Sequence, residues 1–164
     1  SIGLIPENEL SQSAGVEMDP VTNGAVVDEH RQTSIPGVFA CGNVLHVHDL
    51  VDNVSAEAMI AGRAAAAYVQ GALKPSAQYA VRGINGVRYA VPQHVSAAAE
   101  GKIDVYFRVG SAYRPATLAV KCGDTVVRTR KKQIMTPGEM EKMSVDMSKI
   151  TGDIAREIEE ARPQ

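Results

Sequence analysis

The stretch Thr33-Ser-Ile-Pro-Gly-Val-Phe-Ala-Cys-Gly-Asn43 contains a short apolar run that stops at a glycine. The run Val38–Cys41 is typical of a buried strand, and Gly42 would let a ligand approach the backbone with no side chain in between. Further along, the sequence predicts a helix over Asp52–Gln70. Its positive N-terminal end would favour an anionic or electron-rich ligand group. This stretch therefore predicts a strand–glycine–helix crevice that accepts a ligand.

Local signals predict further elements on both sides of this crevice. Pro6–Ser13 can form a short helix, and Asn23-Gly24 is a strong turn signal that predicts a hairpin. The helix over 52–70 would be capped by Asp52 or Asn53 and closed by Gly71. Its small residues would allow close approach of a neighbouring backbone or ligand: Ala58, Ala61, Gly62, Ala65 and Ala66.

From Lys74 onward the hydrophobic pattern changes to a period of two. In the run 103–109, odd positions are apolar and even positions are charged or aromatic, which predicts a strand with two different faces. Further strands are predicted at 87–91, 118–122, 125–134 and 143–147. Short strands at about ten-residue spacing favour a small sandwich-like or barrel-like β domain. A polar helix is predicted over Thr151–Ala161.

The residues of the crevice also match a known motif. Thr33–Asn43 resembles the second flavin-binding motif of the thioredoxin-reductase-like flavoproteins, or pyridine nucleotide-disulphide oxidoreductases, usually Thr, a few residues, then Gly-Val-Phe/Tyr-Ala-x-Gly-Asp. Ser1–Asn8 resembles the stretch that leaves their NAD(P)-binding domain. Cys41–Asp52 resembles most closely the FAD-dependent oxidoreductases associated with the anaerobic glycerol-3-phosphate dehydrogenase system. The resemblance covers residues 1 to 73, and the β-rich remainder is similar to the C-terminal extension of that subgroup.

The resemblance implies a set of flavin-contacting residues: Gly42, Asn43, His48, Asp49, Leu50, Val51 and Asp52. Gly42 would lie at the diphosphate–ribityl region of FAD. Asn43 stands where the superfamily has Asp, so its contact with a ribityl hydroxyl would carry no charge. Residues 48–50 would face the pyrimidine edge of the isoalloxazine, and the helix amides from Val51 onward would stabilise the reduced flavin. No catalytic residue is predicted.

We expect the chain to be a C-terminal piece of a longer FAD-dependent, NAD(P)-linked oxidoreductase. It begins at Ser1 without an initiator Met, and it lacks the Gly-rich FAD and NAD(P) fingerprints and any Cys-x-x-Cys. The predicted fold class is α+β, with residues 1–74 the remnant of an FAD/NAD(P)-binding α/β domain and residues 75–164 a small β-sandwich-like domain. Such a piece should be inactive and should not retain FAD by itself. Its uncovered apolar surface predicts self-association.

Other readings of the chemistry-bearing residues remain open. His46-x-His48-Asp49 offers groups that bind divalent metals, but no third ligand is set by spacing, so no metal site is predicted. The two histidines could instead hydrogen-bond, line the flavin edge or be solvated. Cys41 and Cys122 are expected to be small apolar residues without a reactive thiolate.

Composition narrows the function classes. The 164 residues carry 17 basic and 19 acidic side chains, only 4% are aromatic and none is Trp, which argues against nucleic-acid binding. No apolar run reaches the length of a membrane span, and two distant cysteines favour a reducing cytoplasm. The basic run Arg128–Lys132 is expected to be a solvated strand edge. The alternative function is a non-catalytic module that docks an oxidoreductase partner subunit through the β domain.

Overall fold

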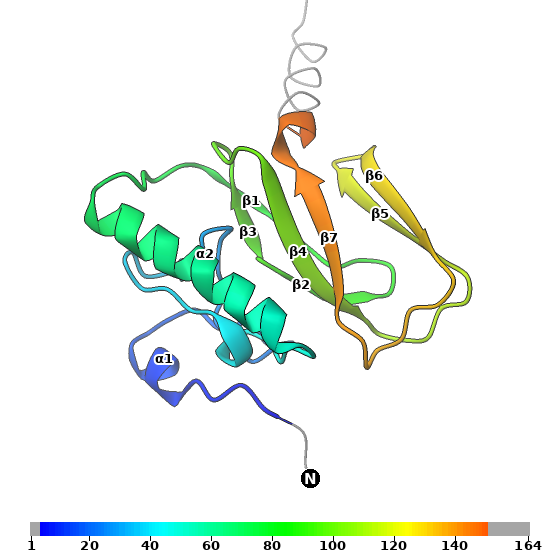
Figure 1. The fold of residues 1–164 in the computed structure, drawn as a ribbon, viewed down its shortest axis with the longest axis horizontal. Helices are drawn as coiled ribbons and strands as arrows, with labels where there is room; N and C mark the ends of the chain where they lie inside the picture. The colour runs from blue at the N-terminus through cyan, green and yellow to red at the C-terminus, as the bar shows by residue number, and fades with distance from the viewer. Residues whose placement is uncertain (1–3, 151–164) are drawn as a thin grey trace, which may run out of the picture.

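The computed structural model describes residues 4–150. The N-terminal half holds α1 (Glu9–Ser13), the 3-10 turn η1 (Gly42–Val44) and α2 (Val51–Val69), joined by long irregular loops (Figure 1). The predicted helix over residues 6–13 therefore exists, but it begins three residues later. The hairpin predicted at Asn23-Gly24 is reduced to one antiparallel bridge between Met18 and Ala25.

The predicted buried strand at Val38–Cys41 is wrong. Only Phe39 takes part in β pairing, as an isolated bridge to Gln32, and the side chain of Val38 is 39% exposed. A buried strand needs hydrogen-bonded neighbours on its sides. Residues 4–150 supply only this single bridge, so the apolar run is an extended loop segment.

The long helix matches its prediction closely. It begins at Val51, ends at Val69 and is followed by Gly71, whose φ of +68° suits the left-handed position after a helix. The predicted side-chain cap is wrong, because Leu50 is the N-cap and no side chain caps the first turn. Of the small residues, Ala61 lies on the buried face, whereas Gly62 is exposed.

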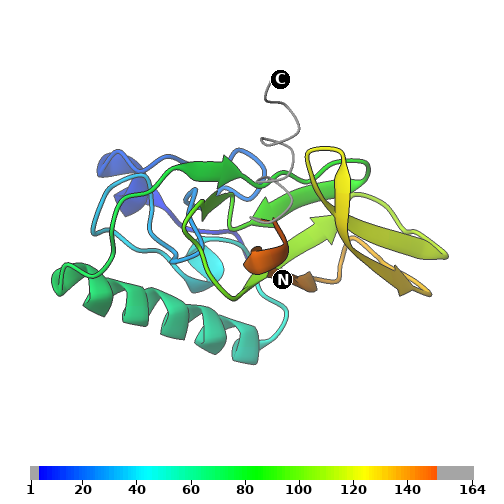
Figure 2. The same ribbon diagram turned by 90° about the horizontal axis from the view of Figure 1, so that it is seen from above.

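The C-terminal half is built of antiparallel strands. Their bounds are β1 Gln78–Ala80, β2 Val87–Val91, β3 His94–Ser96, β4 Lys102–Val109, β5 Ala116–Cys122, β6 Thr125–Lys132 and β7 Glu141–Asp146. They form a three-stranded sheet in the order β2–β4–β7 and two two-stranded sheets, β1–β3 and β5–β6. Together with the helices they make an α+β structure, as predicted. Both views place α2 and the β5–β6 hairpin at opposite ends of the molecule (Figures 1 and 2).

The central strand β4 presents the two different faces that its alternation predicted. Ile103, Val105 and Phe107 line an apolar groove of about 550 Å³ between the three-stranded sheet and the β5–β6 hairpin. On the other face, Tyr106 and Arg108 contact the N-terminal half. Strand β4 therefore joins the apolar part of the β structure to the loops before α2.

The two halves of the chain share one hydrophobic core. Val91 is fully buried in a cluster with Val27 and Leu45 from the N-terminal half. The backbone of Val27 accepts a hydrogen bond from the Gln93 N–H at 3.0 Å, and its own N–H donates to the Gln93 side chain at 3.1 Å. The boundary at residue 74 stays a prediction, and packing continues across it.

Strand β6 pairs only with β5 among the described strands, and Arg128 and Lys131 are exposed, as expected of a solvated edge. Three of its basic side chains also make contacts within the fold. Arg128 and Arg130 donate to backbone carbonyls of β7, and Arg130 also pairs with the buried carboxylate of Glu141 at 2.8 Å. Lys132 pairs with the same carboxylate. These cations thus attach the β5–β6 hairpin to the edge of β7.

Two sequence predictions concern the ends and the membrane. The helix predicted over Thr151–Ala161 lies outside the described residues. Within residues 4–150, no helix combines the length and the apolar character that a membrane crossing requires.

Candidate functional site

A buried carboxylate joins α2 to the loop formed by residues 41–50, which we call the crevice loop. Glu57 projects from the helix, is fully buried, and accepts hydrogen bonds from the Arg31 Nε at 2.9 Å and from the Gly42 N–H at 2.8 Å. Two imidazoles also reach it, His48 Nε2 at 2.9 Å and His46 Nε2 at 3.5 Å. Each carboxylate oxygen therefore has two nitrogen neighbours, and the turn that carries Arg31 meets the loop 42–48 on one side chain.

The Arg31 side chain is delivered by a tight turn. The Asp28 carboxylate accepts hydrogen bonds from the N–H groups of His30 and Gln32, each at 2.9 Å. This local pattern stabilises a turn and lets Arg31 adopt a φ of +65°, which non-glycine residues rarely adopt. The guanidinium is only 1% exposed, so its charge must be matched by Glu57.

Aromatic rings from the β structure close the cluster. Tyr106 on β4 lies edge-on to both imidazoles, with centroids 5.9 Å from His46 and 5.7 Å from His48. Tyr89 on β2 packs against His46 in the same way at 6.0 Å. The charged groups are therefore shielded from water by residues that come from the second half of the chain.

Burial and pairing set the protonation states here. Burial raises the pKa of Glu57, but the hydrogen bonds from His46 and His48 and the charge of Arg31 outweigh it and hold the pKa far below its usual range. Burial lowers the pKa of His46 and favours the neutral ring. The Nδ1 atoms of both imidazoles lack a hydrogen-bond partner among the described residues. For His46, a neutral ring that carries its proton on Nε2 and donates it to Glu57 fits this environment.

The structure supplies the third metal-binding group that the sequence spacing did not. Ligand atoms of His46, His48 and Glu57 lie within 4.8 Å of one another. Two observations nevertheless favour a hydrogen-bonded cluster. A divalent cation would add positive charge beside the buried Arg31, and metal-bound imidazoles normally donate their second N–H to a partner, which neither Nδ1 atom has in residues 4–150.

The cluster predicts a loss of stability in acid. Because the folded pKa of His46 lies below its ordinary value of 6.5, the unfolded chain takes up this proton first as pH falls through about 6.5. The lowered pKa of Glu57 adds a second loss below its ordinary value of 4.5. Urea unfolding from about pH 7 to pH 4 should show the first step, and measurements continued to about pH 2 should show the second. His46→Gln should remove the upper step, whereas His94→Gln should leave it; an unchanged upper step in the first variant would contradict this assignment.

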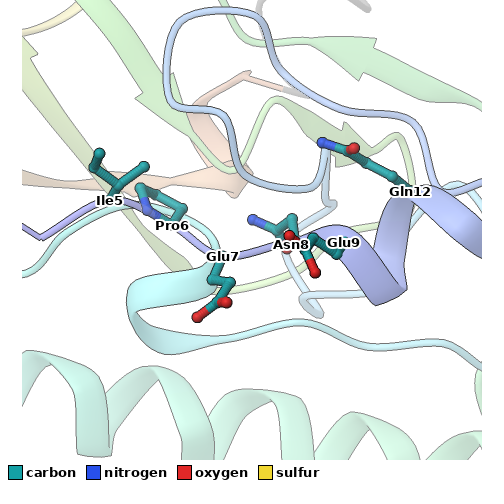
Figure 3. Close-up of a pocket in the computed structure, with 6 residues that line it drawn as sticks. All are labelled: Ile5, Pro6, Glu7, Asn8, Glu9 and Gln12. Carbon is teal, nitrogen blue, oxygen red and sulfur yellow. The ribbon is translucent and has the colours of Figure 1, made fainter.

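The crevice loop is closed by hydrogen bonds of its own. Gly42 is buried with a φ of +74°, and the Asn43 side-chain oxygen accepts the His48 N–H at 3.1 Å. From the N-terminal segment, the Asn8 amide donates to the Val44 carbonyl at 2.7 Å. Asn8 points from the start of α1 toward this turn, beside a pocket lined by residues 5–9 and Gln12 (Figure 3). The first stretch of the chain thus holds the glycine turn in place.

The residues after His48 lead into α2 at the surface. Asp49 is bound on both carboxylate oxygens, by Arg108 and by the Met140 N–H at 2.6 Å. Leu50 and Val51 are 63% and 78% exposed, and Asp52 is exposed in the first turn. This end of the helix therefore presents apolar side chains to solvent, and no side chain caps its first turn.

The structure divides the predicted flavin-contacting residues into two groups. Asn43, Leu50, Val51 and Asp52 are accessible around the start of α2, whereas Gly42 is buried with its N–H bound to Glu57. His48 is buried and its ring turns to Glu57, whereas the Asp49 carboxylate is 36% exposed and is bound by Arg108 of the β structure. Contact of any of these residues with a cofactor stays a prediction.

Sequence reasoning missed the residues that organise the site, namely Glu57, Arg31, Tyr106 and Arg108. One signal was available for Glu57. It shares the spacing of the buried residues Ala61 and Ala64 on an Ala-rich helix, and a lone carboxylate on an apolar stripe needs a buried partner. The other three are marked by no comparable local signal.

The N-terminal part of the chain, which includes the crevice loop, is similar to known proteins. Residues 1–72 match the family model described as pyridine nucleotide-disulphide oxidoreductase. The first part of this chain is therefore similar to a segment of such oxidoreductases. A stretch of 47 residues is 47% identical to putidaredoxin reductase CamA of Pseudomonas putida, covering 29% of this chain and 10% of that protein. No solved structure gives a significant match. The β structure beyond residue 72 lies outside the matched region.

Proposed function

We propose that this chain supplies the second flavin-contacting segment of an FAD-dependent, NAD(P)-linked oxidoreductase. The observation that carries the proposal is the family match over residues 1–72, which includes the glycine turn and the start of α2. The similarity of Cys41–Asp52 points to the subgroup associated with anaerobic glycerol-3-phosphate dehydrogenase. The partial relative is by name a reductase of putidaredoxin, so transfer of electrons to a separate acceptor protein is one form this activity could take.

The exposed end of α2 is suited to such a cofactor. Leu50 and Val51 offer apolar surface for an aromatic ring system, and the first-turn N–H groups have no side-chain cap. The positive end of a 19-residue helix stabilises negative charge. Asn43 is exposed in η1, and its side-chain oxygen accepts the His48 N–H, so its amide NH₂ is the group left to meet a ribityl hydroxyl.

In this proposal, the cofactor carries out the redox chemistry and the protein positions the cofactor. Bound FAD would pass hydride equivalents between a nicotinamide and an acceptor, while the protein orients the ring and sets its electrostatics. In this chain, Glu57 and Asn8 hold the glycine turn, and the first turn of α2 has no side-chain cap. The Gly-rich fingerprints for FAD and NAD(P) are absent from the sequence, so FAD binding would require further chain.

The test is visible absorption of the complete polypeptide that carries this sequence, with residues 1–164 purified beside it. Flavin absorption in the longer protein alone is the expected result. Bleaching of that absorption by NADH or NADPH would also support the proposed reaction with a nicotinamide. A colourless longer protein that fails to take up added FAD would overturn the proposal.

The exposed apolar residues on α2 predict self-association of residues 1–164. Three apolar side chains on this helix are largely exposed: Val51 (78%), Met59 (56%) and Val69 (86%). Together they expose more apolar surface than one isolated side chain would. Sedimentation at increasing concentration should show a dimer or larger species. Replacing all three with Ser should shift the equilibrium to monomer, while Arg63→Ser, an exposed polar change on the same helix, should not. A wild-type chain that stays monomeric would contradict this expectation.

The alternative of a docking module for a partner subunit has less support. It was based on the extra β domain and on the basic run in β6, and Arg130 and Lys132 of that run pair with Glu141 inside the fold. A partner would have to compete with these internal ion pairs.

A further inference from the structure

One side chain of the β structure reaches the loop that leads into α2. Arg108 on β4 donates through Nη2 to the Val47 carbonyl at 3.0 Å and to the Asp49 carboxylate. Through Nη1 it donates to the Gly138 carbonyl at 2.7 Å. The second Asp49 oxygen accepts the Met140 N–H. Two segments far apart in sequence are thereby attached to the same short loop.

This contact differs from an ordinary surface ion pair. The side chain of Arg108 is only 16% exposed and that of Asp49 36%. Burial raises the pKa of Asp49, but the hydrogen bonds from Arg108 and from the Met140 N–H outweigh it and lower the pKa. The guanidinium also binds two backbone carbonyls on different segments, a fixed fork geometry that Lys cannot reproduce.

The Arg108–Asp49 contact lies at the point where the chain enters α2. His48 is anchored on Glu57, and α2 begins at Val51. Between these two fixed points, Asp49 and Leu50 set the direction in which the helix start faces solvent. The Asp49 carboxylate is held by one hydrogen bond from the Arg108 side chain and one from the Met140 backbone N–H.

We propose that Arg108 is a positioning residue for the cofactor site, through which the β structure holds the Val47–Asp49 loop and orients the start of α2. This inference rests on the proposed flavin function. It assigns the C-terminal half a part in the site itself. Arg108 acts through Asp49 and is not placed in contact with the cofactor.

The contacts of Arg108 with Val47 and Asp49, called the clamp below, can first be tested without any cofactor, on residues 1–164. Amide hydrogen exchange of residues 47–52 should accelerate about tenfold or more in Arg108→Ala, because local opening loses the hydrogen bonds that oppose it. Arg108→Lys should recover part of the protection, and Asp49→Asn should give an intermediate rate while leaving Arg108 in place. Arg88→Ala, an exposed arginine on the neighbouring strand β2, is the matched control. Exchange in Arg108→Ala equal to that control would overturn the clamp.

The second readout is the flavin in the complete polypeptide. There, Arg108→Ala should raise the FAD dissociation constant about tenfold, because a disordered loop must be ordered on binding, and should shift the visible flavin spectrum. Arg108→Lys should restore part of both and Arg88→Ala should change neither. FAD affinity and spectrum unchanged in Arg108→Ala would overturn the positioning role. Absence of flavin in the wild-type protein would instead overturn the proposed function, while the exchange result would still decide whether the clamp exists.

Discussion

Glu57→Gln is expected to lower the free energy of unfolding by about 3–5 kcal/mol, the cost typical of removing one partner from a buried ion pair. The substitution leaves the guanidinium of Arg31, 1% exposed, without its counter-charge. It also turns one acceptor oxygen into an NH₂ group that faces donors such as the Gly42 N–H. Urea unfolding followed by circular dichroism measures the loss.

A matched control separates this effect from the loss of any acidic residue. Glu100→Gln removes an exposed carboxylate and should change stability by less than about 0.5 kcal/mol. A loss below about 1 kcal/mol in Glu57→Gln would show that Arg31 is solvated or finds another partner. It would also weaken the case that this cluster holds the glycine turn on α2.

Gly24→Ala should be at least as damaging, with an expected loss of more than about 3 kcal/mol or failure to fold. A Cβ at this position would overlap the backbone carbonyl of Leu45. Both segments are buried, and neither can yield as a flexible side chain would. The expected readout is the unfolding midpoint, or the soluble yield where no folded protein is obtained.

The control for this change is Gly62→Ala. Gly62 is exposed in the middle of α2, and a Cβ there meets no atom within 4 Å. Alanine should therefore stabilise the helix by about 0.5–1 kcal/mol. Equal behaviour of the two variants would mean that the close approach of residues 24 and 45 does not hold in solution.

Elements that depend on nearby residues were predictable. The helix from Val51 to Val69 is encoded by an alanine-rich stretch that is followed by Gly71, and the two-faced strand β4 by its alternation. The turn at Asn23-Gly24 was also predicted, but for an incomplete reason. Asn23, with a φ of +56°, supplies the turn conformation, whereas Gly24 is required by the Leu45 backbone packed against it.

The parts that were not predictable depend on contacts between distant segments. Val38–Cys41 has the composition of a buried strand, yet pairing partners and not composition decide whether a strand forms. The local pattern around Glu57 indicates at most a carboxylate on the buried face of a helix and does not identify its partners. Its role exists only because Arg31, Gly42 and two histidines converge on it.

The sequence alone was sufficient for the α+β class, the long helix, the strand alternation and the resemblance of the glycine turn to a flavin-binding motif, because these reside in residues close together along the chain. Tertiary structure decided which way His48 and Asp49 face and that Arg108, 59 positions from Asp49, holds their loop. The physical reason is that a buried charge is stable only beside its partner. The pairing is therefore set by where the folded backbone brings the two groups, and no local pattern records it.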